Sequence, residues 1–146
     1  MIMQGKVYIT RKEHFNAAHK LYNKKWSEEK NIEVFGPCAN KNWHGHNFEL
    51  SVTVSGSPDP DTGFVADFKK LGKLIKSEII EKVDHKNLNL DVDFLQGKMA
   101  TCEIFSIEIW DILEPHVALL GKNVKLHCIK LVETPGNFAE YYGEKI

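Results

Sequence analysis

The sequence is poor in the features that would mark a secreted or membrane-bound protein. Its 146 residues hold three cysteines, Cys38, Cys102 and Cys128. An odd and widely spaced set is not the pattern of a disulfide framework, so we expect a protein of a reducing compartment, the cytoplasm. No apolar run approaches the roughly 20 residues that a membrane-spanning helix needs, so we expect no membrane partner.

The sequence also lacks an excess of charge of either sign. Lys and Arg number 19 and Asp and Glu number 20, which gives a net charge of -1 with neutral histidines. A binding face built on bulk positive charge is therefore not indicated, and we expect no nucleic-acid partner. The hydrophobic share of 42% is ordinary for a globular protein. The length suits one domain, predicted over residues 1–146.

What the sequence does contain is a histidine pair at the start of a predicted strand. His44, Gly45 and His46 lead into an alternating apolar segment from Phe48 to Val54. Residues two apart in a strand share a face, so the two imidazoles project together. Imidazole suits zinc, copper, nickel and iron, and a catalytic zinc usually has three protein ligands and one open position. On its own the pair is a weak signal, because two histidines on a strand can simply be surface residues.

A third ligand is available on the preceding predicted strand, residues 6–19. Phe15, Ala17 and His19 alternate in one register there, whereas His14 faces the other way. His19 is therefore the candidate ligand of this strand, and a water-exposed histidine at a strand end is the alternative.

Other residues supply groups that can move protons. Cys38 lies in a loop before the histidine pair, where a nearby cation would favour the thiolate, a base or nucleophile. Asp84 and His85 combine a carboxylate with an imidazole, which suits general acid–base work near neutral pH. A histidine stabilised at a helix end is the alternative, and adjacent side chains are not expected to bond each other. Glu133, at a strand end, could hold a flat heterocycle by two parallel hydrogen bonds.

The rest of the pattern predicts two helices between two pairs of strands. One helix begins at a capping residue, Asp67, and ends near Val83; the other begins at Thr101 and is closed by Pro115. Residues 20–43 are predicted to be a long polar connection. Strands are expected over residues 6–19, 46–55, 124–132 and 138–142, with a brief strand over 64–66, and the main order is ββ-α-α-ββ.

These blocks together resemble the 6-pyruvoyl tetrahydropterin synthase family, which has 6-carboxy-tetrahydropterin synthases as close relatives. The resemblance implies an α+β T-fold, in which a four-stranded antiparallel sheet carries two helices on one face. It also implies a homohexamer of two trimers, in which the sheets close into a barrel and the active sites lie between subunits. The blocks that carry the resemblance are residues 15–19, 35–38, 44–47, 84–89 and 133–134.

The resemblance assigns the metal and the reaction. His19, His44 and His46 would hold zinc, which would chelate the side-chain hydroxyls of the substrate. In the family the substrate is 7,8-dihydroneopterin triphosphate, a small-molecule pterin that loses triphosphate and rearranges internally without a redox cofactor.

The resemblance also implies a role for each of the other site residues. Cys38 would act as the base. Asp84 and His85, supplied by a neighbouring subunit, would assist proton transfer to and from the substrate hydroxyls. Glu133 would anchor the pterin ring, with Thr101 near it at the helix start.

Two alternatives stay open. The 6-carboxy synthases of queuosine biosynthesis have a shorter interval between the cysteine and the histidine pair, so the separation of Cys38 from His44 favours the pyruvoyl enzyme.

Family members carry threonine or serine followed by Glu-Asn after the position of Thr101, whereas this chain has residues 102–104 as Cys-Glu-Ile. The other alternative is a non-catalytic, zinc-containing pterin- or purine-binding module, for which a base such as Cys38 would be unnecessary.

Overall fold

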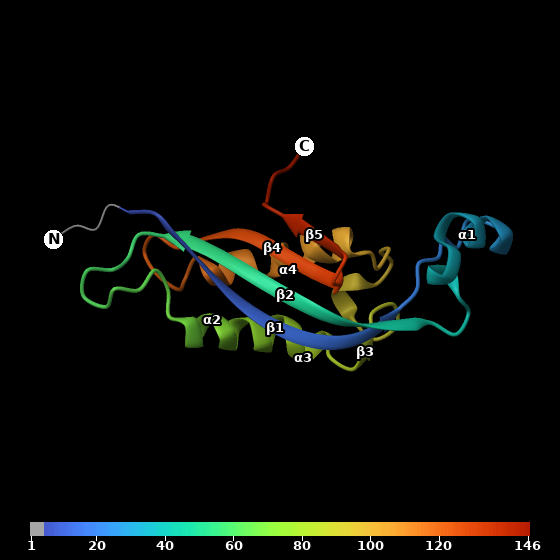
Figure 1. Ribbon diagram of the computed structural model, residues 1–146, viewed down its shortest axis with the longest axis horizontal. Coiled ribbons are helices and arrows are strands. Elements are labelled where there is room, and N and C mark those ends of the chain that lie inside the picture. Colours follow the sequence, from blue (N-terminus) through green and yellow to red (C-terminus); the bar gives the residue numbers. More distant parts are fainter. Residues whose placement is uncertain (1–4) are drawn as a thin grey trace.

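The computed structural model describes residues 5–146, so the first four residues of the predicted domain lie outside the described part. The molecule is built on one twisted sheet, whose strand order is β3-β1-β2-β4-β5 (Figure 1). The strands are β1 Val7–His19, β2 His44–Gly56, β3 Lys86–Asn87, β4 Lys125–Thr134 and β5 Asn137–Tyr141.

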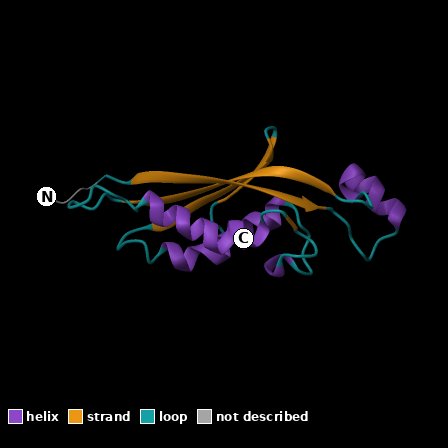
Figure 2. Cartoon of the chain, turned by 90° about the horizontal axis from the view of Figure 1, so that it is seen from below, coloured by secondary structure: helices purple, strands orange, loops and turns teal. Residues whose placement is uncertain are grey.

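The long helices cover one face of this sheet, as Figure 2 shows, whereas the short helix α1 projects from one end (Figure 1). A π-helical segment, Lys76–Ile80, joins α2 to α3, and 3-10 turns occupy Gly36–Ala39 and Asp93–Leu95. Among residues 5–146, no helix is long and apolar enough to cross a membrane. The helices are α1 Glu28–Phe35, α2 Phe68–Ile75, α3 Glu81–Val83 and α4 Cys102–Val117.

Strands β1 and β2 form a continuous antiparallel ladder. Their register runs from Val7 opposite Gly56 to His19 opposite His44. Because directly opposite residues share a face, the ladder brings the end of β1 and the start of β2 together with their histidines on one side. On that same side Phe15 stacks on its cross-strand neighbour Phe48, with ring centroids 4.9 Å apart.

The core lies between this face of the sheet and the helices. In the segment from Asp67 to Val83, the apolar residues at helical spacing are buried at Leu71, Ile75, Ile79 and Val83, but Phe68 is exposed. Asp67 caps α2 by accepting the Lys69 N–H at 2.8 Å, and Thr101 caps α4 in the same way from the Ile104 N–H at 3.3 Å. The buried side chains with the largest volumes include Phe15, Phe48, Phe105, Leu50, Leu71, Ile75, Ile79, Ile109 and Leu113.

The α+β class and the order of the main elements are as predicted, but the sheet is not purely antiparallel and four-stranded. A fifth strand, β3, pairs in parallel with β1 through Ala17 and Lys86. It is only two polar residues long and carries no hydrophobic alternation, so the sequence gives no sign of it. The predicted strand over residues 64–66 is wrong, because these residues form a bend that leads into the Asp67 cap.

Two further expectations need correction. Residues 20–43 are not a structureless connection, because α1 and a 3-10 turn form within them. The second long helix does not end at Pro115, since it continues to Val117. The helix can continue past Pro115 because a proline removes only its own backbone N–H from the hydrogen-bond pattern. Beyond it, the Ala118 N–H donates to the Glu114 carbonyl and the Leu119 N–H donates to the His116 carbonyl.

Candidate metal centre

Three histidines meet where the β1–β2 ladder ends. His19 lies at the last position of β1, and His44 and His46 share one face of β2, as the alternation predicts. The ring centroid of His19 is 4.6 Å from that of His44 and 5.2 Å from that of His46, and the last two are 4.8 Å apart. The ladder thus brings three imidazoles from two strands into direct contact.

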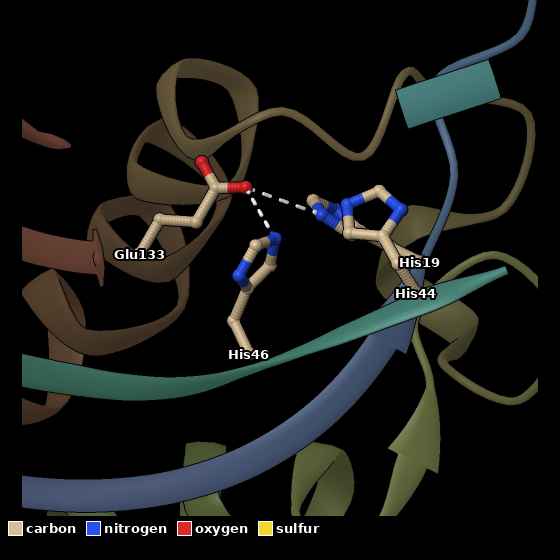
Figure 3. Close-up of side chains that lie close together, drawn as sticks. All are labelled: His19, His44, His46 and Glu133. Carbon is tan, nitrogen blue, oxygen red and sulfur yellow. Dashed lines mark ion pairs between the residues drawn. The ribbon is translucent and has the colours of Figure 1, made fainter. Parts of the chain in front are cut away.

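Glu133 completes this group from β4, the strand on the other side of β2 (Figure 3). Its Oε1 lies 2.8 Å from Nε2 of His46 and 3.3 Å from Nε2 of His19. The candidate ligand atoms of the four residues all lie within 4.8 Å of one another. From the sequence, Glu133 was expected only at the pterin ring, because nothing in one sequence states that β4 pairs with β2.

Four imidazole nitrogens of these histidines are buried without a hydrogen bond among the described residues, although the Glu133 carboxylate lies close to two of them. Nδ1 of His19 lies 2.8 Å from the Ala100 carbonyl oxygen, so it carries the proton and leaves Nε2 with a lone pair. Within residues 5–146, no hydrogen bond satisfies Nε2 of His19, Nε2 of His46 or either ring nitrogen of His44. Unpaired buried polar atoms are costly, and a bound metal ion would satisfy them. Imidazole and carboxylate are ligands that zinc accepts, so these residues fit such an ion.

The surroundings of His44 and His46 favour their neutral form. Burial is the largest cause that lowers the pKa of both His44 and His46. Positive charge on His19 lowers the pKa of both residues further, and positive charge on His46 also lowers the pKa of His44. The negative charge of the Glu133 carboxylate raises the pKa of both. Neutral imidazole is the form that binds metal ions.

The thiol of Cys102, at the position where this chain departs from the family pattern, lies against Glu133. Cys102, the first residue of α4, donates its S–H to Oε2 of Glu133 at 3.5 Å. It is 8% exposed, as expected for a small buried residue. Burial first, and the Glu133 carboxylate second, raise the pKa of this thiol, so it remains protonated and acts as a donor.

Asp84 and His85 form a pair of their own, and His85 lines a pocket that also includes His46. Oδ1 of Asp84 accepts the Asn16 N–H at 2.9 Å and lies 3.0 Å from Nδ1 of His85. The Asn16 hydrogen bond is the main cause that lowers the pKa of Asp84. The expectation that the two adjacent side chains would not pair is wrong, because His85 has a left-handed backbone with φ of 59°. Its side chain is 78% exposed.

The remaining predicted site residues lie at the edges of this region. Cys38 is half-buried in the 3-10 turn, where its carbonyl accepts the Leu21 N–H at 2.7 Å and its thiol is free. Thr101 uses its hydroxyl for the helix cap. A cavity of about 720 Å³ lies beside Glu133, and its lining also includes Cys102, Glu103, Gly136, Asn137, Phe138, Ala139 and Glu140.

Comparison with known proteins decides the family, because the 6-pyruvoyl tetrahydropterin synthase family matches this chain over residues 8–144. The chain belongs to that family. It is 40% identical over 136 residues to the 6-pyruvoyl tetrahydrobiopterin synthase of Homo sapiens, which covers 93% of this chain and 91% of that protein. The structure of 6-pyruvoyl tetrahydropterin synthase from Caenorhabditis elegans superposes on it with a TM-score of 0.86 at 36% identity, covering 99% and 100% of the two chains.

A second branch of this family is more distant. The 6-carboxy-5,6,7,8-tetrahydropterin synthase of Bacillus subtilis is 27% identical over 135 residues, covering 90% of this chain and 82% of that protein. The resemblance read from the sequence blocks is therefore confirmed at the level of the family, and its T-fold is the fold that the Caenorhabditis elegans structure shares with this chain.

Proposed function

We propose that this protein is a zinc-dependent 6-pyruvoyl tetrahydropterin synthase, a carbon–oxygen lyase that eliminates triphosphate from 7,8-dihydroneopterin triphosphate with internal rearrangement. The observation that carries the proposal is the cluster of His19, His44, His46 and Glu133, in which four buried imidazole nitrogens have no hydrogen bond among the described residues. Membership of a family of pterin synthases supplies the reaction class.

The metal would be held by His19, His44 and His46. A zinc ion bound there supplies Lewis acidity, which lowers the pKa of substrate hydroxyls and of the adjacent C–H bonds. Nε2 of His19 is oriented for this task by the hydrogen bond between Nδ1 and the Ala100 carbonyl.

The chain's own residues would move the protons. Cys38 would take a proton from the substrate carbon as the base, which is consistent with its free thiol. Asp84 and His85 would relay protons at the hydroxyls. Because the side chain of His85 is largely exposed, the pair would be accessible to the site of a neighbouring subunit.

The pterin ring would lie in the cavity beside Glu133. A carboxylate that accepts two parallel hydrogen bonds matches the amino group and ring N–H of a pterin. The cavity of about 720 Å³ borders Glu133 and a second carboxylate, Glu103, which suits a ligand rich in donors. Thr101 begins the helix next to this cavity.

The proposal extends to the assembly and the compartment. The working form would be a cytoplasmic homohexamer of two trimers, with a small-molecule pterin as the only substrate and without nucleic-acid or membrane partners. Within the described residues, β3 and β5 form the two edges of the sheet, and edge strands are commonly covered by pairing with another chain.

A 6-carboxy-tetrahydropterin synthase is the second candidate, supported by the Bacillus subtilis relative. A non-catalytic zinc-containing pterin-binding module is the third. The presence of Cys38, Asp84 and His85 argues against this last candidate, because binding alone requires neither a base nor a relay.

The deciding experiment is incubation of the zinc-loaded protein with 7,8-dihydroneopterin triphosphate, followed by mass spectrometry of the products. A 6-pyruvoyl product together with triphosphate would establish the proposed reaction. A 6-carboxy product together with acetaldehyde would assign the second candidate. Absence of turnover with the metal bound would favour the third candidate, the non-catalytic pterin-binding module. The His44→Ala variant is the matched control for activity that does not depend on the centre.

A further inference from the structure

Cys38, the proposed base, lies in a segment that contributes almost nothing to the core. Residues 20–43 leave the sheet at the end of β1 and return at the start of β2, and α1 within them projects from the molecule (Figure 1). Of these residues only Asn31 and Ala39 are buried. Burial of apolar surface, which stabilises most of a folded chain, is therefore scarce here. The position of the Cys38 thiol depends on other contacts.

The side chain of Asn31 is the centre of a hydrogen-bond network inside this segment. Its Oδ1 accepts the Asn23 N–H at 2.6 Å, and its Nδ2 donates to the carbonyls of Asn23 and Ser27, each at 3.0 Å. The residue is 0% exposed. A buried amide that is bonded to the backbone at both ends has one orientation, and its removal leaves buried backbone groups without this partner. Asn31 therefore holds residues 23–27 against the helix that follows them.

Two further contacts connect α1 to the thiol. The Gly36 N–H donates to the Ile32 carbonyl, and the φ of 57° at this glycine turns the chain into the 3-10 turn that contains Cys38. The Cys38 carbonyl accepts the N–H of Leu21, which lies two residues after the proposed metal ligand His19. The thiol is thus held from both sides of the segment, and the buried amide joins these two sides.

We propose that Asn31 is a positioning residue of the reaction, whose amide fixes the segment that presents the Cys38 thiol to the substrate. The inference rests on the proposed role of Cys38 as the base. The three clustered histidines lie on the β1–β2 ladder, outside residues 20–43, so Asn31 should affect proton removal and not the metal. Misplacing a catalytic group by about 1 Å can lower a rate about 100-fold.

The first measurement is kcat and KM for 7,8-dihydroneopterin triphosphate, with zinc content determined on the same samples. Asn31→Leu keeps the size of the side chain but removes the amide, and we expect kcat to fall about 10- to 100-fold while KM and zinc content stay unchanged. Glu33→Leu is the matched control, because it places the same side chain at an exposed position of the same helix. An unchanged kcat for Asn31→Leu, or an equal loss for Glu33→Leu, would overturn the proposal.

A double-variant cycle separates positioning of the base from a general loss of structure. If Asn31 acts through Cys38, then Asn31→Leu should lower the residual turnover no further once Cys38→Ala has removed the thiol. An equal fold loss in both backgrounds would overturn the proposal. Circular dichroism of each variant establishes that the fold is intact.

The second measurement needs no substrate. Alkylation of Cys38 by iodoacetamide, followed by mass spectrometry of its peptide, reports how firmly the half-buried thiol is held. The rate should rise severalfold in Asn31→Leu, because a loosened segment exposes the thiol, and should stay at the wild-type value in Glu33→Leu. An unchanged rate in Asn31→Leu would overturn the proposal. A raised rate in a protein whose wild type does not turn over the pterin would support the role of Asn31 and refute the proposed function alone.

Discussion

His19 shows how a single hydrogen bond prepares a side chain for its chemistry. It is 2% exposed, and its Nδ1 is committed to the Ala100 carbonyl. The ring therefore has one orientation and one tautomer, with the Nε2 lone pair directed at His46 and Glu133. His44 has no such partner within residues 5–146, so its orientation depends more strongly on the ion itself.

The first prediction concerns these ligands. His44→Ala and His46→Ala should each lose stoichiometric zinc, because each variant removes one of the three imidazoles that would hold the ion. Metal content is measured by elemental analysis after dialysis. His14→Ala is the control, since His14 lies on the opposite face of β1 and lines a different hollow. Full zinc occupancy in His44→Ala would refute the site.

The second prediction concerns the base. Cys38→Ala should retain zinc and assembly but lower kcat about 10²- to 10⁴-fold, the range that general acid–base catalysis contributes. Turnover of 7,8-dihydroneopterin triphosphate is the measurement, with zinc content determined on the same sample. Cys128→Ala should turn over normally. Normal turnover by Cys38→Ala would remove this thiol from the mechanism.

Helix caps are the clearest case in which the sequence alone locates an element. Asp67 and Thr101 were both predicted as starting residues, and both accept backbone N–H groups in the structure. The same signal was overlooked at Ser27, which caps α1 by accepting the Lys30 N–H at 3.1 Å ahead of an acidic first turn. Recognising it would have corrected the expectation for residues 20–43.

From the sequence, only those site residues could be placed that follow the alternating pattern of a single strand. Alternation on β1 and β2 places His19, His44 and His46 on one face, and this is where they lie. The contact of Glu133 with the histidines depends on long-range pairing of β4 with β2, and the contact of Cys102 depends on how α4 packs on the sheet. Such tertiary contacts leave no periodic signal in a single sequence.

The third prediction tests the cap of α2. Asp67→Ala should lower the free energy of unfolding by about 1 kcal/mol, because the Lys69 N–H loses its acceptor. Thermal or denaturant unfolding is the measurement. Asp67→Ser, which keeps a capping oxygen, should remain near the wild type; a loss equal to that of the alanine variant would contradict the assignment.

The fourth prediction concerns the segment after β5. Gly143 has φ of 75°, and a Cβ added there would overlap the ring of Trp110 on α4. Gly143→Ala should therefore lower the free energy of unfolding by about 1–3 kcal/mol. Gly136→Ala is the control, because a Cβ there meets nothing within 4 Å. Equal unfolding midpoints for the two variants would mean that the segment does not pack on α4 in solution.

For the whole molecule, the proposed mechanism has a consequence for assembly, because it assigns Asp84 and His85 to the site of a neighbouring subunit. His85 is exposed and pairs with Asp84, whereas His19, His44 and His46 cluster beside Glu133. Complete sites would therefore require at least two copies of the chain, and the open sheet edges at β3 and β5 provide surfaces through which copies can associate.

The fifth prediction is that inactive variants complement each other. Subunits of Cys38→Ala and His85→Ala, mixed 1:1, dissociated and reassembled, should regain up to about a quarter of wild-type activity, because random assembly builds that share of sites from intact parts. Mixing His85→Ala with Asp84→Ala should regain none, since both variants damage the same contribution. An inactive first mixture with confirmed exchange of subunits would place all groups of a site on one chain.

The register of β1 against β2 has a consequence for folding. A slip of two residues would keep every apolar side chain on the core face, so burial alone distinguishes poorly between neighbouring registers. Only the native pairing sets His19 opposite His44. An ion bound to these imidazoles would therefore stabilise the correctly aligned hairpin over its slipped forms, and uptake of metal by a newly made chain would report that its strands are in register.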